Sequence, residues 1–284
     1  MVATTLVLMS VLGAGDAYVA GPVKLVAEGF KFIEGPLWLP GNELIFSDIP
    51  ANAICKIDKT VFRQPSGESN GLTLDGEGRL IACEGGNRRV TRTEKDGSIV
   101  VLAETHEGKK LNSPNDVVVR ADGVIFFTDP PYGVSPDKRE LTFQAVFAVL
   151  KDGTVKLAQD DFIKPNGIGL SPDGKTLYVA DTEGNHIRAF DVAEDGSLSN
   201  NRVFCELPGP DGMAIDTKGY VWCTAQDGVR VLTPEGKLVH TVATPQVPAN
   251  CAFGGPDLKT LYITARTGLY SVPVTTPGLR IGPK

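Results

Sequence analysis

The stretch NGIGLSPDGKTLYVAD, residues 166–181, decides the fold of this chain because it spells out one complete β-hairpin. It begins with a polar residue, continues with the short apolar segment GIGL, turns at SPDGK and ends with the β-rich segment TLYVA. An Asp-Gly pair between two β-rich segments is typical of a tight hairpin turn. The stretch therefore predicts two antiparallel strands, with a polar residue at the start of the first.

The same phrase occurs six times along the chain. Its copies are EGPLWLPGNELIFSD (34–48), NGLTLDGEGRLIAC (70–83), NDVVVRADGVIFFTD (115–129), NGIGLSPDGKTLYVAD (166–181), DGMAIDTKGYVWCTA (211–225) and NCAFGGPDLKTLYITA (250–265). Successive copies start 36 to 51 residues apart, near the period of propeller blades, and the intervening sequence has room for two more strands. We therefore predict an all-β, six-bladed β-propeller with four-stranded blades. The alternative is a β-sandwich whose hairpins are alike by coincidence.

The two ends of the chain supply complementary parts of the sixth blade. The last copy is followed by one further β-rich segment, GLYSVPV at 268–274, and then by a tail rich in Pro and Gly. Residues 23–29, before the first copy, can provide the missing strand. Pairing of the N- and C-terminal strands removes the exposed edges of an open sheet. We assign residues 23–284 to the propeller and residues 1–22 to an N-terminal apolar segment.

Composition and charge narrow the functional classes. The 284 residues carry a formal net charge of −6 without a basic stripe, which argues against a nucleic-acid partner. The apolar residues 3–15 are too few to span a bilayer, so no membrane partner is predicted. They resemble the apolar core of a signal peptide but lack basic residues before it. The sequence leaves a cytoplasmic location and export to the periplasm or medium both open, and it does not specify the oligomeric state.

The cysteines do not indicate a metal or redox motif. The five form no CxxC pair, and four lie in or beside apolar stretches. We expect small, buried thiols.

The repeat places one polar residue of each blade at the central channel. The innermost strand of a blade lines the axis, so the residues at its start meet at one mouth of the channel. These residues are Glu34, Asn70, Asn115, Asn166, Asp211 and Asn250. Two carboxylates and four amides in a confined space repel one another and lack hydrogen-bond partners unless a positive ion lies between them.

This all-oxygen ring suits one divalent cation, Ca²⁺ best of all. Mg²⁺ and Mn²⁺ fit the same donors, and Zn²⁺ and Fe²⁺ stay open, although zinc normally binds through His or Cys. The chain's His106, His186 and His240 fall at other phases of the repeat and are expected to be surface or packing residues. The competing interpretation is that the six ring residues only form turns, because Asn and Asp before Gly are common there.

Several segments together resemble the SMP-30/gluconolactonase/luciferin-regenerating enzyme family, especially its bacterial gluconolactonase-like members. They are EGPLW (34–38), NRRV (87–90), SPNDVVV (113–119), FTDPPYG (127–133), PNGIGLSPDGKTLYVADT (165–182) and GPDGMAID (209–216). The resemblance covers nearly the whole chain after residue 25. It implies a six-bladed propeller that uses a metal ion to hydrolyse a sugar lactone to the aldonic acid.

The resemblance also implies which ring residues hold the cation. They are Glu34, Asn115, Asn166 and Asp211. Asn70 and Asn250 are then expected to lie behind these ligands or to face the substrate. Two departures concern the substrate: Gly85 stands where many relatives have a His in CEHGNRR, and Ser113 stands where the animal members have an Arg.

Lactone hydrolysis assigns a task to each part of this site. The cation polarises the carbonyl, and Asp211 is the expected general base, with a water activated by the cation as the alternative. Asn112, Asp129 and Tyr132 are further candidates for substrate binding, because residues 130–143 interrupt the third blade and are long enough to overhang the channel mouth. Asp129 is equally compatible with a turn at the end of a strand.

Two other functions fit the same sequence. The scaffold and cation could serve a phosphotriesterase-like hydrolase, and a propeller without catalytic activity could bind a protein or a glycan. Rates on lactones and on a fluorophosphate separate the first from a lactonase, and the second predicts no metal-dependent activity.

Overall fold

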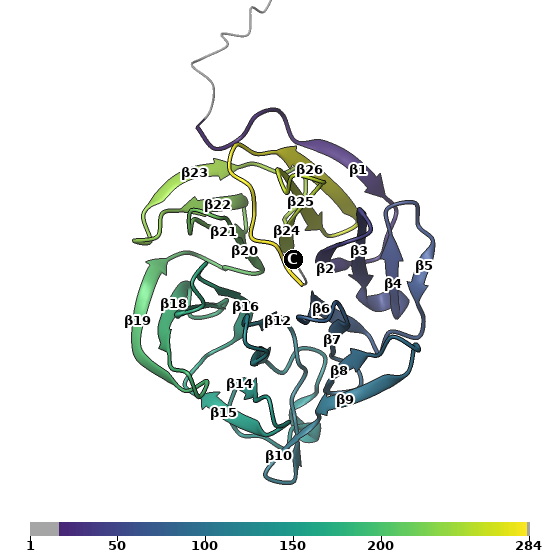
Figure 1. The fold of residues 1–284 in the computed structure, drawn as a ribbon, viewed down its shortest axis with the longest axis vertical. Helices are drawn as coiled ribbons and strands as arrows, with labels where there is room; N and C mark the ends of the chain where they lie inside the picture. The colour runs from purple at the N-terminus through teal and green to yellow at the C-terminus, as the bar shows by residue number, and fades with distance from the viewer. Residues whose placement is uncertain (1–16, 283–284) are drawn as a thin grey trace, which may run out of the picture.

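The computed structural model describes residues 17–282, which form a ring of six four-stranded antiparallel sheets around a central axis (Figure 1). Each sheet is one blade, and its four strands lie side by side in order from the axis to the rim. The helical elements within residues 17–282 are two short 3-10 turns, Ile49–Ala51 and Pro136–Lys138. The prediction of an all-β, six-bladed propeller is confirmed.

The first five blades follow chain order. Blade 1 contains β2 (Ile33–Leu39), β3 (Glu43–Asp48), β4 (Ala53–Lys56) and β5 (Val61–Arg63). Blade 2 contains β6 (Ser69–Leu74), β7 (Leu80–Glu84), β8 (Arg89–Thr93) and β9 (Ile99–Ala103). Blade 3 contains β12 (Val117–Val119), β13 (Ile125–Asp129), β14 (Ala145–Val149) and β15 (Val155–Gln159). Blade 4 contains β16 (Pro165–Leu170), β17 (Thr176–Asp181), β18 (His186–Val192) and β19 (Leu198–Glu206). Blade 5 contains β20 (Met213–Ile215), β21 (Val221–Ala225), β22 (Gly228–Leu232) and β23 (Leu238–Val242). A small hairpin of β10 (Thr105–His106) and β11 (Lys109–Lys110) precedes blade 3.

Blade 6 joins the two ends of the chain, as predicted. Its strands are β24 (Asn250–Gly254), β25 (Thr260–Ala265), β26 (Gly268–Pro273) and, at the rim, β1 (Lys24–Glu28). β1 pairs antiparallel with β26, so that Leu25 lies opposite Tyr270. Just before β1, the Ala20 amide donates a hydrogen bond to the Pro273 carbonyl at 2.8 Å.

The N-terminal apolar segment 3–15 lies outside the described residues. Within residues 17–282, no helix has the length and apolar character needed to cross a membrane.

The hydrophobic core lies between the blades. It is divided into six clusters, one at each junction of neighbouring blades within the part of the chain that the structure describes. Phe127 and Ile81 belong to the cluster between blades 2 and 3. Phe46 and Leu269 belong to the cluster that joins blade 1 to blade 6. Each blade is therefore stabilised by both of its neighbours, and closing the ring buries the last of these surfaces.

Four of the five cysteines are buried thiols as expected, whereas Cys205 is not buried. All five are unpaired; Cys55, Cys83, Cys223 and Cys251 are buried, and Cys205 is partly exposed.

Glycines allow the innermost strands to approach one another closely. In four blades a glycine directly follows the ring residue: Gly35, Gly71, Gly167 and Gly212. A Cβ atom on Gly167 would lie 2.1 Å from the Asp211 carbonyl oxygen, and one on Gly35 would lie 2.0 Å from that of Asn70. Any side chain at these positions would push neighbouring blades apart. The Asn-Gly pairs of β6 and β16 lie inside strands, so the interpretation of these ring residues as turn formers is wrong there.

Buried hydroxyl groups link blade 1 to blade 2, blade 3 to blade 4 and blade 5 to blade 6 at the same level. Ser47 donates to the carbonyl of the ring residue of blade 2 at 2.8 Å, and Thr128 donates to the Asn166 carbonyl at 2.7 Å. Thr224 reaches the Ala249 carbonyl at 2.8 Å. These bonds fix the backbone of one inner strand against the second strand of the preceding blade.

Replacing Thr224 by Val tests the contribution of these hydroxyl bonds. The side chain is fully buried, and valine keeps its shape while removing the donor. We expect Thr224→Val to lower the free energy of unfolding by about 1 kcal/mol. Denaturant titration measures this change. The control Thr105→Val alters an exposed threonine and should change the value by less than about 0.5 kcal/mol; equal effects of both variants would contradict the assignment.

Candidate metal and substrate site

All six predicted ring residues lie at the axis, at the start of the innermost strands. Four of them are in those strands, and Asn115 and Asp211 each precede theirs by two residues. The innermost strands contact one another in a closed circuit: β2 with β6, β6 with β12, β12 with β16, β16 with β20, β20 with β24 and β24 with β2. The register of the repeat therefore places all six residues at the same end of the innermost strands.

The two ring carboxylates lie close to each other, with Glu34 buried and Asp211 partly buried. Glu34 is 4% exposed; burial raises its pKa well above 4.5, and the negative charges of Asp211 and Asp116 raise it further. Burial, with a further contribution from Asp116, raises the pKa of Asp211 from 3.8 to about 7. The Oδ1 atom of Asp211 is buried and has no hydrogen-bond partner among residues 17–282. A carboxylate oxygen in this state is a strong candidate ligand for a cation.

Asp116 is a third buried carboxylate, which the sequence analysis missed. Its Oδ1 accepts the Val117 amide hydrogen bond at 2.9 Å and its Oδ2 accepts that of Ile168 at 3.3 Å. Burial raises its pKa to about 6. The available signal was the phrase itself, because Asp116 occupies the position where four other copies have glycine. Gly71 of the preceding blade makes room for it, since a Cβ there would lie 2.5 Å from the Asp116 Oδ1.

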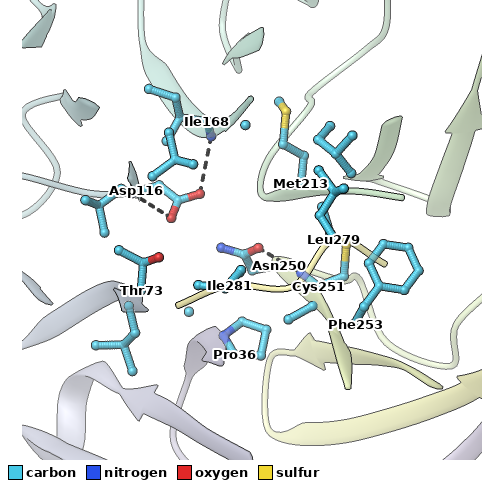
Figure 2. A pocket seen from close by; sticks show the side chains of 18 of the residues that line it. Pro36, Thr73, Asp116, Ile168, Met213, Asn250, Cys251, Phe253, Leu279 and Ile281 are labelled. Atoms are coloured by element: carbon cyan, nitrogen blue, oxygen red, sulfur yellow. Dashed lines mark hydrogen bonds between the residues drawn. The ribbon is translucent and has the colours of Figure 1, made fainter. Parts of the chain in front are cut away.

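Asn250 faces an inner cavity of about 110 Å³ rather than the outer pocket described below. Figure 2 shows the polar groups of Asp116, Asn250 and Thr73 on this cavity, with Leu279 and Ile281 of the C-terminal segment also lining it. The Asn250 Oδ1 accepts the Cys251 amide at 2.8 Å, while its side chain hydrogen-bonds both Glu34 and Asp116 and partly opposes the rise in their pKa values. Asn250 thus lies behind the carboxylates, which fits an indirect role better than the predicted contact with substrate.

The outer pocket, of about 320 Å³, opens beside the ring between blades 2 and 3. Asn70, Asn115 and Tyr132 line it, as expected for residues that contact a ligand. Val134 and Lys138 line it too, so residues 130–143 border the pocket as predicted. Three further lining residues were not predicted from the sequence: Glu68, Lys138 and Arg88, the last of which lies within the segment NRRV.

Tyr132 connects this pocket to the ring. The Asn166 Nδ2 donates to the Tyr132 hydroxyl at 3.3 Å and to the Thr182 hydroxyl at 3.0 Å. Burial, and next the charge of Asp211, raise the pKa of Tyr132 to about 12, so it stays a neutral hydroxyl. Because the Asn166 amide nitrogen makes these bonds, its oxygen is the atom left to bind a cation.

Asn112 and Asp129 lie behind the pocket wall instead of facing it. Asp129 is fully buried, and its Oδ2 accepts the Asn112 amide at 2.7 Å. The Asn112 Nδ2 donates to the Asp129 and Phe143 carbonyls at 3.2 and 3.0 Å. Asp181 holds the chain before Asn166 in the same manner, by accepting two backbone amides. Neither residue lines the pocket, and both hold the segment that carries Asn115, so their contact with substrate stays a prediction.

The histidines are remote from the ring, as expected. His106 packs against Phe147, His186 lies 3.9 Å from Asp181, and His240 stacks on Tyr18. Within residues 17–282, no three His, Cys, Asp or Glu side chains gather as a metal site by themselves. A cation at the axis would have to use the amide oxygens together with the carboxylates.

Comparison with known proteins places the chain in a family. The family model described as the SMP-30/gluconolactonase/LRE-like region matches residues 32–267. The chain belongs to the SMP-30/gluconolactonase/LRE-like family. This SMP-30/gluconolactonase/LRE-like chain is 31% identical to a gluconolactonase of Zymomonas mobilis over 300 residues, which cover 92% of this chain and 83% of the relative.

Two solved structures are similar to the whole propeller. A putative gluconolactonase is 37% identical, with a TM-score of 0.87 over 93% of this chain and 96% of the other. A gluconolactonase from Xanthomonas campestris is 33% identical, with a TM-score of 0.84 over 91% of this chain and 92% of the other.

The raised pKa values predict how the stability of the metal-free protein depends on pH. The pKa of Asp211 rises from 3.8 to about 7 on folding and that of Glu34 also rises, so the folded state binds more protons over this range. The free energy of unfolding should therefore fall as pH increases from about 4 to about 7. Urea titrations with a chelator present measure this slope. Asp211→Asn should reduce it; a slope that is unchanged in this variant would contradict the assignment.

Proposed function

We propose that this chain hydrolyses a sugar lactone to the aldonic acid with a divalent cation held by Glu34, Asn115, Asn166 and Asp211. The observation that carries the proposal is the ring of buried oxygen donors beside a polar pocket, with the Asp211 Oδ1 lacking a partner within residues 17–282. The names of the relatives, gluconolactonases at 31% to 37% identity, support the same reaction.

The donors present fit Ca²⁺. Hard cations of this type bind carboxylate and amide oxygens, and two carboxylates balance the two positive charges. Glu34 and Asp211 supply the charge, and the amide nitrogen of Asn166 is already occupied by Tyr132 and Thr182. When bound, the cation would polarise the lactone carbonyl and stabilise the negative charge that develops on its oxygen.

The residues of the chain perform the remaining steps. Asp211, as a carboxylate, accepts a proton from the attacking water while the water oxygen bonds to the carbonyl carbon. The bond from that carbon to the ring oxygen then breaks, and the proton passes to the departing ring oxygen, which becomes a hydroxyl of the aldonic acid. Asn70, Asn115 and Tyr132 border the pocket next to this point and can orient the sugar hydroxyls.

Substitution of Asp211 separates its chemical task from structure. Asp211→Ala removes both a cation ligand and the base, so kcat/KM on glucono-1,5-lactone should fall at least about a hundredfold. Asn70→Ala, which alters a neighbour in the pocket, should cost about tenfold. Asp160→Ala changes an exposed carboxylate and is the matched control. Circular dichroism checks the fold, and wild-type turnover by Asp211→Ala would refute the assignment.

Binding of Ca²⁺ should stabilise the ring as well as support catalysis. Glu34 and Asp211 come from blades 1 and 5, and a ligand that binds only the folded state adds about 2.7 kcal/mol at one hundred times its Kd. We expect the melting temperature to rise by several degrees on adding Ca²⁺ after EDTA, and Glu34→Gln to reduce this rise. Equal melting in Ca²⁺ and EDTA, with no metal in the purified protein, would exclude the cation site.

A further inference from the structure

Arg266 lies at the mouth of the channel, in the tight turn between β25 and β26. The ring residue of blade 6, Asn250, pairs with Thr264 near the end of β25, and the chain turns directly afterwards. The corresponding turn of blade 2, which contains Gly85 and Gly86, lines the outer pocket. Arg266 is therefore on the same side of the ring as that pocket, but at the junction of blades 6 and 1 instead of blades 2 and 3.

Three contacts fix the turn and support the side chain of Arg266. Its carbonyl accepts a hydrogen bond from the Ile33 amide at 2.9 Å, one residue before the ring residue of blade 1. Its guanidinium carbon lies 5.3 Å from the centroid of the Phe32 ring, within the range of a cation–π interaction. The next residue, Thr267, donates its amide to the Gln246 Oε1 at 3.1 Å. The guanidinium is thus held beside the mouth of the ring.

The positive charge of Arg266 is not neutralised by a neighbour. The residue is exposed, and its guanidinium has no hydrogen-bond or salt-bridge partner among residues 17–282. In the corresponding turn of blade 4, Glu183 forms an ion pair with Lys164. In that of blade 5, the Asp227 carboxylate lies 2.5 Å from the Arg230 guanidinium. A guanidinium with all its donors available is suited to bind a ligand with acceptor oxygens.

The charge of Arg266 acts on the ring itself. Burial raises the pKa of Asp211 to about 7, and the Arg266 guanidinium opposes this rise. Glu34, Asp116 and Asp211 together carry three negative charges when ionised, one more than a divalent cation neutralises. The remaining charge would repel an anionic ligand beside the cation. Arg266 supplies the positive charge that offsets this repulsion.

Hydrolysis of a lactone changes the charge of the ligand in this site. The lactone is neutral, whereas the product acid is ionised at neutral pH, because carboxyl groups have pKa values of about 4. The new carboxylate forms at the reacting carbon, which is the part of the ligand at the axis. Arginine binds carboxylates through two parallel N–H donors. Arg266 can bind this group from blade 6 while the sugar hydroxyls stay in the outer pocket.

We propose that Arg266 binds the carboxylate of the aldonic acid product, as a second positive group beside the cation. This inference rests on the proposed lactonase function and extends it to the regulation of the same site by its product. An aldonate that accumulates then competes with the neutral lactone and slows the enzyme. The site accordingly selects sugar acids over neutral sugar alcohols of the same length.

Inhibition by gluconate at a fixed free Ca²⁺ concentration tests the proposal. Arg266→Gln keeps a polar side chain but removes the charge, so the ratio of Ki for gluconate to KM for glucono-1,5-lactone should rise about tenfold. Arg266→Lys keeps the charge and should restore part of the loss. Arg280→Gln, which changes an exposed arginine of the C-terminal segment, is the matched control and should leave the ratio unchanged. An unchanged ratio in Arg266→Gln would overturn the inference.

Binding experiments separate a charge effect from damage to the ring. Arg266→Gln should bind Ca²⁺ at least as tightly as the wild type, because a positive charge near the cation is removed, whereas a distorted ring would bind it more weakly. Calorimetry with saturating Ca²⁺ should show that this variant loses affinity for gluconate but not for D-glucitol, the neutral polyol of the same length. Equal losses for both ligands, or no gluconate binding by the wild type, would contradict the proposal. If the wild type does not hydrolyse the lactone but binds gluconate through Arg266, the proposed function fails and the carboxylate site stands.

Discussion

Direct contact between the backbones of neighbouring inner strands is the constraint on which the rest of this propeller depends. At Gly71 the amide donates to the Asn115 carbonyl at 2.7 Å, and at Gly212 the amide donates to the Ala249 carbonyl at 2.8 Å. Strands this close leave no room for a side chain between them. The residue before each glycine is consequently left with its side chain near the axis, so the contact that closes the ring also assembles the polar site. Fold and site share one cause, which is why the repeat specifies both.

Assembly of this site works against the electrostatics of the folded chain. Hydrophobic packing between blades brings Glu34, Asp116 and Asp211 close enough to raise one another's pKa values. Arg266 opposes the rise in the pKa of Asp211, but the net effect of the surroundings is still to favour protonation. Such opposition between stability and local charge is common where binding or catalysis takes place. The six apolar junctions between blades stabilise the folded state and so offset the cost of bringing these carboxylates together.

The architecture and the ring could be predicted from sequence because both follow from the phase of a repeat. The alternation of apolar residues and the Gly-bearing turns predict each hairpin. Because the polar residue stands at the same position in all six copies, the repeat also predicts which residues face the axis. Asp116 was not predicted, because side chains alternate in a regular strand and the neighbour of an inward-facing residue points the other way in that pattern. β12 begins only at Val117, and the irregular chain before it leaves both side chains in the interior.

The repeat does not predict the roles of residues whose partners are distant in the sequence. Asp129 and Asn112 meet because a strand end and an incoming segment lie side by side in the folded blade. Arg88 has a positive φ of 59° and binds carbonyls from two loops whose conformations no local pattern fixes. From the sequence, Asp129 and Asn112 were predicted to contact the substrate, and no role was predicted for Arg88.

Closure of blade 6 by β1 also governs how the protein can form on the ribosome. β1 is synthesised before blades 1 to 5, whereas its partner β26 is synthesised after them. Until then the face of blade 1 that carries Phe30 and Phe46 has no blade 6 against which to pack. At cellular rates of about 5–20 residues per second, this apolar face waits on the order of tens of seconds for Leu269 to arrive. The nascent chain thus passes through an open intermediate that exposes this apolar surface. We expect chaperones that bind during translation to bind at its first blade.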